Sequence, residues 1–256
     1  PFILRRSKKE VLTELPDKIE QNIILPFNDE EEKLYVANLA EVNKELQELY
    51  DLEGSDKMQI LKLLTRLRQL CLEPRLVYDN IDQPSSKLKA CMELIKTMQE
   101  NKQKVLLFSS FTSVLDLIAE ECQKAGITYY MLTGSTNKED RRELVSRFQK
   151  DDTTVFLISL KAGGTGLNLT SAEAVIHFDP WWNPAIEDQA TDRAHRFGQK
   201  NVVEVIKLIS KGSIEEKIIK LQESKKEIIN EIMSGNYTNG GFLSSLSSDE
   251  IKELFN

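Results

Sequence analysis

From residue 86 onward, short apolar runs alternate along the chain with longer stretches of helical periodicity. The helical stretches begin at Ser86, Thr112, Thr136 and Ser213, and some open with a capping box. Strands that alternate with helices predict a parallel sheet covered by helices on both faces. The apolar runs, each predicted to be a strand, occupy 104–109, 127–132, 154–159, 174–178 and 202–209.

Residues 28–72 follow a different pattern, in which apolar positions step by three and four. One stripe runs from Tyr35 to Leu49 and a second from Ile60 to Cys71, with a break at 54–56. We expect two amphipathic helices, packed as an antiparallel hairpin or as a docking arm, and then a linker. The opening residues predict a short helix that ends at Leu15, followed by a strand that turns at Pro26.

The unusual loops of the predicted sheet all follow strands. In such sheets ligands bind beyond the carboxyl ends of the strands, so we expect these loops to share one edge. The glycines of the third loop allow close backbone approach, and loop N–H groups suit phosphates. The plainer alternatives are a flexible turn for the glycines and a packing anchor for the tryptophans, Trp182 above all. The loops span 109–112, 133–135, 161–168 and 179–184.

A further helix is predicted behind the last of these loops. Asn183 is a suitable N-cap, Pro184 suits a first helical position, and Gly198 would end the helix. Gln189, Arg193 and Arg196 then recur at i, i+4 and i+7, which predicts that they share one helix face. Two arginines one turn apart form a fork of donors suited to phosphate oxygens. The alternative is a solvated, charged helix face.

Two common nucleotide signatures are absent from the sequence. There is no Gly-x-x-x-x-Gly-Lys-Ser/Thr loop to cradle a triphosphate, and no Asp-Glu pair after an apolar strand to hold magnesium. A phosphate-binding edge without its own nucleotide loop indicates half of a two-part site.

Composition narrows the class of protein. The chain has 256 residues, of which 40% are hydrophobic and 29% charged, as in globular proteins. No apolar run could cross a membrane, no signal peptide is visible, and the first residue is Pro, which indicates a piece of a longer protein. Three scattered cysteines and two histidines predict no metal site and a reducing compartment. The net charge of -7 restricts any nucleic-acid contact to a few loops.

Several stretches together resemble the second RecA-like lobe of a Swi/Snf-family ATP-dependent DNA translocase, within the superfamily-two helicases. The matching segments cover nearly the whole chain, and the tail at 241–255 is similar to that of bacterial members, so we expect Asn256 to be a natural C-terminus. The matching segments are PFILRR to ELP at 1–16, LRQLC at 67–71, GGTGLNL at 163–169, DPWWNP at 179–184 and DRAHRFGQ at 192–199.

The resemblance implies an α/β fold with a RecA-like parallel sheet, an inserted helical protrusion and a long C-terminal helix. It divides the chain into an opening segment (1–27), the protrusion with its linker (28–85), the helicase C-terminal lobe (86–212) and a brace helix with its tail (213–256).

The resemblance also implies a role for each loop. The arginines Arg193 and Arg196 would be catalytic fingers that reach a triphosphate on the other lobe. The residues implied to bind or couple ATP are Gly164, Thr165, Gly166 and Gln189. Those implied to contact DNA are Ser109, Ser110, Thr112, Thr133, Gly134, Asn168, Trp181 and Asn183.

The implied partners are ATP and Mg²⁺, both bound mainly by an N-terminal RecA-like lobe, together with double-stranded DNA and a nucleoprotein substrate. No membrane partner is implied, and the implied location is the bacterial cytoplasm and nucleoid, or the nucleus in a eukaryote. Two other functions remain open. One is a superfamily-two helicase that acts on RNA, and the other is a RecA-like binding module without catalysis.

Overall fold

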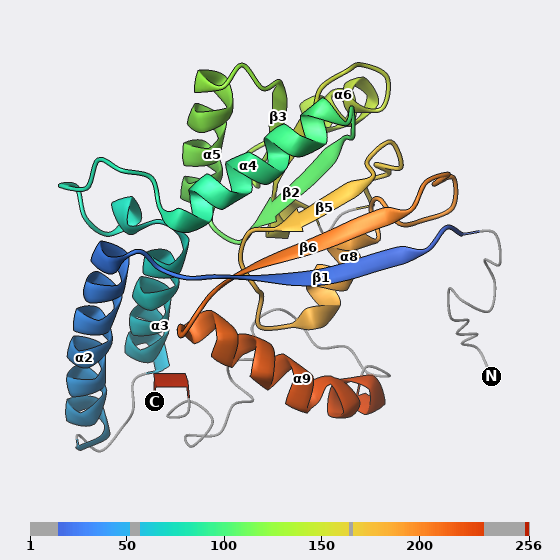
Figure 1. Ribbon diagram of the computed structural model, residues 1–256. Coiled ribbons are helices and arrows are strands. Elements are labelled where there is room, and N and C mark those ends of the chain that lie inside the picture. The colour runs from blue at the N-terminus through green and yellow to red at the C-terminus, as the bar shows by residue number, and fades with distance from the viewer. Residues whose placement is uncertain (1–14, 52–56, 164–165, 233–253, 256) are drawn as a thin grey trace.

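The computed structural model describes residues 15–51, 57–163, 166–232 and 254–255. Its centre is a six-stranded, fully parallel sheet with the strand order β1-β6-β5-β2-β4-β3 (Figure 1). The five strands predicted from residue 86 onward are all present, so the RecA-like α/β architecture is confirmed. The strands are β1 (Lys18–Leu25), β2 (Val105–Ser109), β3 (Tyr129–Leu132), β4 (Val155–Ser159), β5 (Ala174–His177) and β6 (Val203–Ser210).

Helices cover both faces of the sheet, as the alternating pattern predicts. Along β2, Leu107 packs with α4 and α5 on one face, whereas Leu106 and Phe108 pack with α6, α7 and α8 on the other. Every residue of β2, β4 and β5 is therefore buried, which explains why these strands read as continuous apolar runs. The helices are α4 (Ser86–Glu100), α5 (Thr112–Lys124), α6 (Lys138–Phe148), α7 (Leu160–Gly163) and α8 (Pro184–Thr191).

The strand β1 is part of this sheet, although the sequence places it in a separate opening segment. It pairs with β6 in parallel, from Lys18 opposite Val203 to Leu25 opposite Ser210. Its partner lies near the other end of the chain, and a local pattern cannot reveal such a pairing. The short helix expected before β1 lies outside the described residues.

The predicted helical hairpin is formed by α2 (Asp29–Asp51) and α3 (Lys57–Leu72), with the expected break at 54–56 outside the described residues. It stands beyond the end of β1 in Figure 1. Its apolar stripes pack on each other and on the start of α9 (Ile214–Ile232), so they are packing surfaces. The linker contains the short helix η1 (Pro74–Leu76). Among the described residues, no helix is long and apolar enough to span a membrane.

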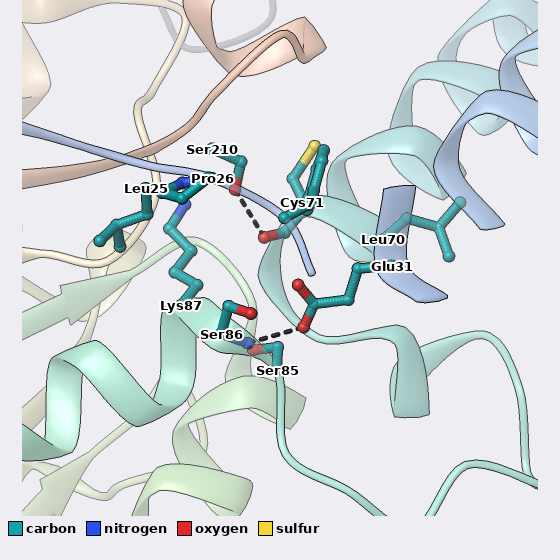
Figure 2. A pocket seen from close by; sticks show the side chains of 10 residues that line it. Leu25, Pro26, Glu31, Leu70, Cys71, Ser85, Ser86, Lys87 and Ser210 are labelled. Atoms are coloured by element: carbon teal, nitrogen blue, oxygen red, sulfur yellow. Dashed lines mark hydrogen bonds between the residues drawn. The ribbon is translucent and has the colours of Figure 1, made fainter. Parts of the chain in front are cut away.

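The hairpin joins the sheet at a closely packed junction, shown in Figure 2. The carboxylate of Glu31 on α2 accepts a hydrogen bond from the N–H of Ser86 at 2.6 Å. The hydroxyl of Ser210, at the end of β6, donates to the carbonyl of Cys71 on α3 at 2.9 Å. These contacts fix the protrusion against the start of α4 and the carboxyl end of β6.

Candidate functional site

The four unusual loops leave the carboxyl ends of β2, β3, β4 and β5, and because the sheet is parallel they share one edge. Two of the loops meet at a single carboxylate. Asp179, after β5, accepts hydrogen bonds from the Ser109 hydroxyl at 2.7 Å and the Ser110 N–H at 3.0 Å, both at the end of β2. The prediction that these loops lie together is confirmed for this pair.

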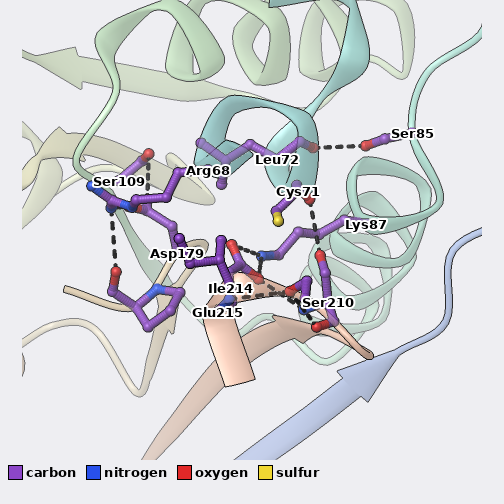
Figure 3. A network of polar contacts seen from close by, with 12 residues as sticks. Arg68, Cys71, Leu72, Ser85, Lys87, Ser109, Asp179, Ser210, Ile214 and Glu215 are labelled. Carbon is purple, nitrogen blue, oxygen red and sulfur yellow. Dashed lines mark hydrogen bonds and ion pairs between the residues drawn. The ribbon is translucent and has the colours of Figure 1, made fainter. Parts of the chain in front are cut away.

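An arginine from the protrusion reaches the same carboxylate, as Figure 3 shows. The Nη2 of Arg68 on α3 lies 2.8 Å from Asp179 Oδ2 and 2.9 Å from the Ser110 hydroxyl, and the side chain is 7% exposed. Three aromatic rings surround the guanidinium, whose Cζ is 5.0 to 5.5 Å from their centroids. These rings belong to Phe111, Trp181 and Trp182.

Sequence reasoning missed Arg68 as a residue of the site. The available signal was an arginine directly beside Leu67 on a stripe of otherwise apolar residues. A cation on the buried face of an amphipathic helix requires an anionic partner, because an unpaired buried charge is costly. The sequence alone could not name that partner.

The backbone of Trp181 is held on both sides. Its N–H donates to Glu187 on α8 at 2.6 Å, and its carbonyl accepts a hydrogen bond from Gln222 on α9. Glu187 also pairs with Lys207 on β6 at 2.6 Å. Burial alone would lower the pKa of Lys207, but the charge and hydrogen bond of Glu187, together with the charges of Glu20 and Asp188, outweigh it and the pKa is raised. Trp182 is 4% exposed and packs with the protrusion, so it is a packing anchor.

The predicted arginine helix is shorter than expected. The helix α8 ends at Thr191, and the residues after it form turns, so Gln189, Arg193 and Arg196 do not share one continuous helix face. The carbonyl of Arg193, which a longer helix would use internally, accepts a hydrogen bond from the N–H of Leu169 at 3.0 Å. The side-chain amide of Gln199 likewise donates a hydrogen bond to the Ala194 carbonyl. Donors outside the helical pattern, the Leu169 N–H and the Gln199 side chain, thus occupy carbonyls that a longer helix would bond internally.

The two arginines have different surroundings. Arg193 is 9% exposed, and burial together with the charge of Arg196 lowers its pKa. Arg196 is partly exposed, and its Nη1 donates to the carbonyl of Leu167 at 3.2 Å. The arginine segment (192–199) is therefore bonded directly to the loop after β4.

That loop carries the predicted glycines. Gly166 has a φ of +44°, a left-handed conformation that favours glycine, and it is exposed together with Asn168. Gly163 lies so close to Phe108 that an added Cβ would be 2.9 Å from its ring. Gly164 and Thr165 lie outside the described residues.

The remaining predicted residues differ in exposure. Ser109 is 1% exposed and its hydroxyl is committed to Asp179, whereas Thr112 and Gly134 are exposed and Thr133 is partly exposed. Thr112 begins α5, whose N-cap Phe111 makes no side-chain cap, so first-turn N–H groups face the edge. The Asn183 side chain caps α8 by accepting from the Ala185 N–H at 3.0 Å.

The described residues fit a polyphosphate better than a metal ion. Arginines and exposed backbone N–H groups suit phosphate oxygens, but no group of three His, Cys, Asp or Glu side chains in the described part of the chain could hold a metal. Burial raises the pKa of all three cysteine thiols, to about 12 for Cys122, so none is a reactive thiolate.

Comparisons with known proteins agree with this geometry. Residues 86–198 match the family described as "Helicase conserved C-terminal domain", and residues 1–76 match the "SNF2-related domain". An "Uncharacterized ATP-dependent helicase" of Mycoplasma pneumoniae is 40% identical over the whole chain, and the "Putative ATP-dependent helicase/translocase YwqA" of Bacillus subtilis is 38% identical. The chain covers 24% and 28% of these two proteins, so it spans about a quarter of their length.

Solved structures place the similarity in one part of such proteins. The "Sulfolobus solfataricus SWI2/SNF2 ATPase C-terminal domain" has a TM-score of 0.73 and 30% identity, covering 93% of this chain and 98% of that one. The same organism's "SWI2/SNF2 ATPase core in complex with dsDNA" has a TM-score of 0.75 and 33% identity, covering 99% of this chain and 54% of that one. The chain therefore belongs to the SNF2 family of ATP-dependent helicase-like proteins, and it has the RecA-like fold of their C-terminal ATPase domain.

Proposed function

We propose that this chain is the second motor lobe of a longer, ATP-dependent double-stranded DNA translocase. The observation that supports this most is the direct bonding between the arginine segment and the glycine loop. The Arg196 guanidinium donates to the Leu167 carbonyl, and the Leu169 N–H donates to the Arg193 carbonyl. A group that moves Arg196 therefore also moves the loop beside it, which is what coupling of nucleotide to DNA requires.

On the nucleotide side, Arg193 and Arg196 act as fingers on a triphosphate that an N-terminal RecA-like lobe holds. They stabilise negative charge that develops on the transferred phosphoryl group when the lobes close. Magnesium would be held with ATP on that other lobe, where it would supply charge neutralisation at the phosphates. Gln189 and the glycine loop, with Gly164, Thr165 and Gly166, couple this nucleotide to the DNA side.

On the DNA side, the exposed groups at the sheet edge contact phosphates of one strand. Thr112 and the open first turn of α5, Thr133 with Gly134, and Asn168 supply these contacts. Trp181 and Asn183, both partly exposed, add contacts from the loop after β5, and Ser109 and Ser110 contribute by holding the loop after β2 in place. Contacts to the backbone carry no base information, so binding is tolerant of sequence. The motor then acts at DNA, in the nucleoid of a bacterium, with nucleoprotein as a substrate.

The test is the ATPase rate of the full-length protein with duplex DNA and, separately, with duplex RNA. We expect strong stimulation by duplex DNA of any sequence and none by RNA, while the 256-residue chain alone does not hydrolyse ATP. Stimulation by RNA instead would support the RNA helicase. Absence of any nucleic-acid-stimulated turnover would support the non-catalytic module.

A further inference from the structure

We propose that Arg68 is a positioning residue that holds the loops after β2 and β5 in the conformation that contacts DNA. The inference deepens the proposed function and rests on it for the identity of the ligand. Arg68 cannot contact DNA itself, because only 5% of the residue is exposed. It acts through the residues that it contacts, among them Asp179, which Figure 3 shows beside Arg68.

The first argument is that two loops share one acceptor. Asp179 receives the hydroxyl of Ser109, the N–H and hydroxyl of Ser110, and the guanidinium of Arg68. These donors come from separate parts of the chain. The orientation of the loop at 109–112 therefore depends on the position of Asp179. That position depends in turn on the Arg68 guanidinium, which pairs with the carboxylate.

The second argument is that Arg68 suits this place and lysine does not. One Nη2 reaches Asp179, the Ser110 hydroxyl and the carbonyl of Pro180 at 3.3 Å, so it contacts both loops. The flat guanidinium lies at the same time against Phe111 and both tryptophans. A lysine keeps the charge, but a point charge on a flexible stem lacks the planar, stacked geometry.

The third argument is where the contacts lead. Phe111 directly precedes Thr112 and the open first turn of α5, and Trp181 lies two residues before Asn183, the N-cap of α8. Leu67 and Cys71, on either side of Arg68 on α3, pack within the protrusion. Arg68 thus joins the protrusion to the two loops that carry proposed DNA contacts.

The first test uses the full-length protein with Arg68→Lys and, as a matched control, Arg66→Lys. Arg66 lies on the same helix but pairs with Glu41 at a partly exposed site. We expect Arg68→Lys to raise the DNA concentration for half-maximal ATPase stimulation about tenfold. A change of that size corresponds to the loss of one well-placed charge-assisted hydrogen bond. The ATP concentration for half-maximal rate should stay the same, and Arg66→Lys should change neither value.

The second test uses tryptophan fluorescence of the 256-residue chain. The chain has two tryptophans, and both rings lie within 5.5 Å of the Arg68 Cζ. A similar domain of the Sulfolobus protein has been solved on its own, so the chain is a suitable unit. We expect Arg68→Lys to shift the emission to longer wavelength with unchanged far-ultraviolet circular dichroism, and Arg66→Lys to shift nothing.

A third variant tests the inference even if Arg68→Lys unfolds. The double substitution Arg68→Met with Asp179→Asn removes both buried charges together, so neither is left uncompensated. It should fold and still require more DNA for half-maximal stimulation. Wild-type DNA dependence in a folded Arg68→Lys or double variant would overturn the inference. Wild-type protein that duplex DNA does not stimulate would overturn the proposed function instead.

Discussion

Within the described residues, two ion pairs have both of their side chains more than nine-tenths buried. Lys87 and Glu215 have side chains 3% and 1% exposed and lie 2.6 Å apart, and Arg68 and Asp179 have side chains 7% and 1% exposed and lie 2.8 Å apart. Each cation also lies over an aromatic ring, which is Phe178 in the case of Lys87. Burial of this kind stabilises a fold only when the charges remain paired.

The two pairs differ in what they connect. Lys87 lies in the first turn of α4. Glu215 lies in the first turn of α9 and also accepts the N–H of Ser210 at 2.8 Å, so this pair joins framework elements. The Arg68 pair joins the protrusion to two loops at the carboxyl edge of the sheet. Burial therefore sets the energy of an ion pair, whereas its neighbours decide whether its loss affects stability or function.

The largest expected effect is on ATP turnover, when an arginine of the segment 192–199 is replaced. In the full-length protein, Arg196→Ala should lower DNA-stimulated turnover by about 10³–10⁵-fold, the range known for arginine fingers, with little change in melting temperature. Arg196→Lys should not rescue turnover, because the fork is lost. Arg193→Ala should reduce turnover similarly and, being buried, should also destabilise the fold.

Steady-state ATPase rates and melting temperatures measured on one preparation test this effect. Arg147→Ala is the control, since its side chain is 60% exposed on α6. If Arg196→Ala keeps normal turnover per folded molecule and only lowers the melting temperature, Arg196 does not act at the nucleotide site. Its role would then be structural, like that of Lys87 and Glu215.

The ion pair of Lys87 and Glu215 should affect stability and not turnover. Lys87→Met leaves Glu215 buried without its cation, which should lower the free energy of unfolding by about 3–5 kcal/mol. Turnover per folded molecule should stay normal, because the pair contacts none of the candidate loops. Urea unfolding measures the change, and adding Glu215→Gln should recover most of it. If a folded Lys87→Met variant lost turnover, the Lys87–Glu215 pair would affect function as the Arg68–Asp179 pair does, and the proposed difference between them would be wrong.

A smaller effect concerns His177, which is buried at the end of β5, beside the loop of Asp179. Burial and the charge of Lys207 lower its pKa to about 3, although Asp179 and Glu20 act in the opposite direction. The unfolded chain binds this proton near pH 6.5, so stability is lost as the pH falls below that value. From pH 7 to pH 5 the free energy of unfolding should fall by about 2 kcal/mol.

Urea unfolding at the two pH values measures that difference, with His177→Gln as the comparison. The glutamine variant should lose about 2 kcal/mol less over the same interval. An equal fall in both proteins would show that His177 is not the group responsible.

The smallest expected effect is the salt dependence of DNA binding by the chain alone. Its net charge of -7 leaves only local contacts at the loops. The logarithm of affinity should therefore fall with the logarithm of salt concentration by a modest slope, about 0.9 for each phosphate contacted. Fluorescence anisotropy with several duplex sequences would measure it. Salt-independent binding, or a strong preference for one sequence, would contradict backbone recognition.

The order of the elements, and the edge where the loops meet, follow from the amino-acid sequence alone. Continuous apolar runs such as 105–109 must be buried on both faces, and helices between them require parallel strands. Parallel strands place every strand-to-helix loop at one edge, so the sequence already predicts that the loops of Ser110 and Asp179 lie on the same side of the sheet. Local periodicity and chain order suffice for these conclusions.

Which residues act on one another depends instead on the tertiary fold. It joined β1 to β6, ended α8 at Thr191 and brought Arg68 to Asp179. Each of these results depends on a partner from another part of the chain, whether a strand edge, a competing N–H donor or a buried carboxylate. A helical stripe shows which side of α3 is buried, but it cannot show what lies opposite.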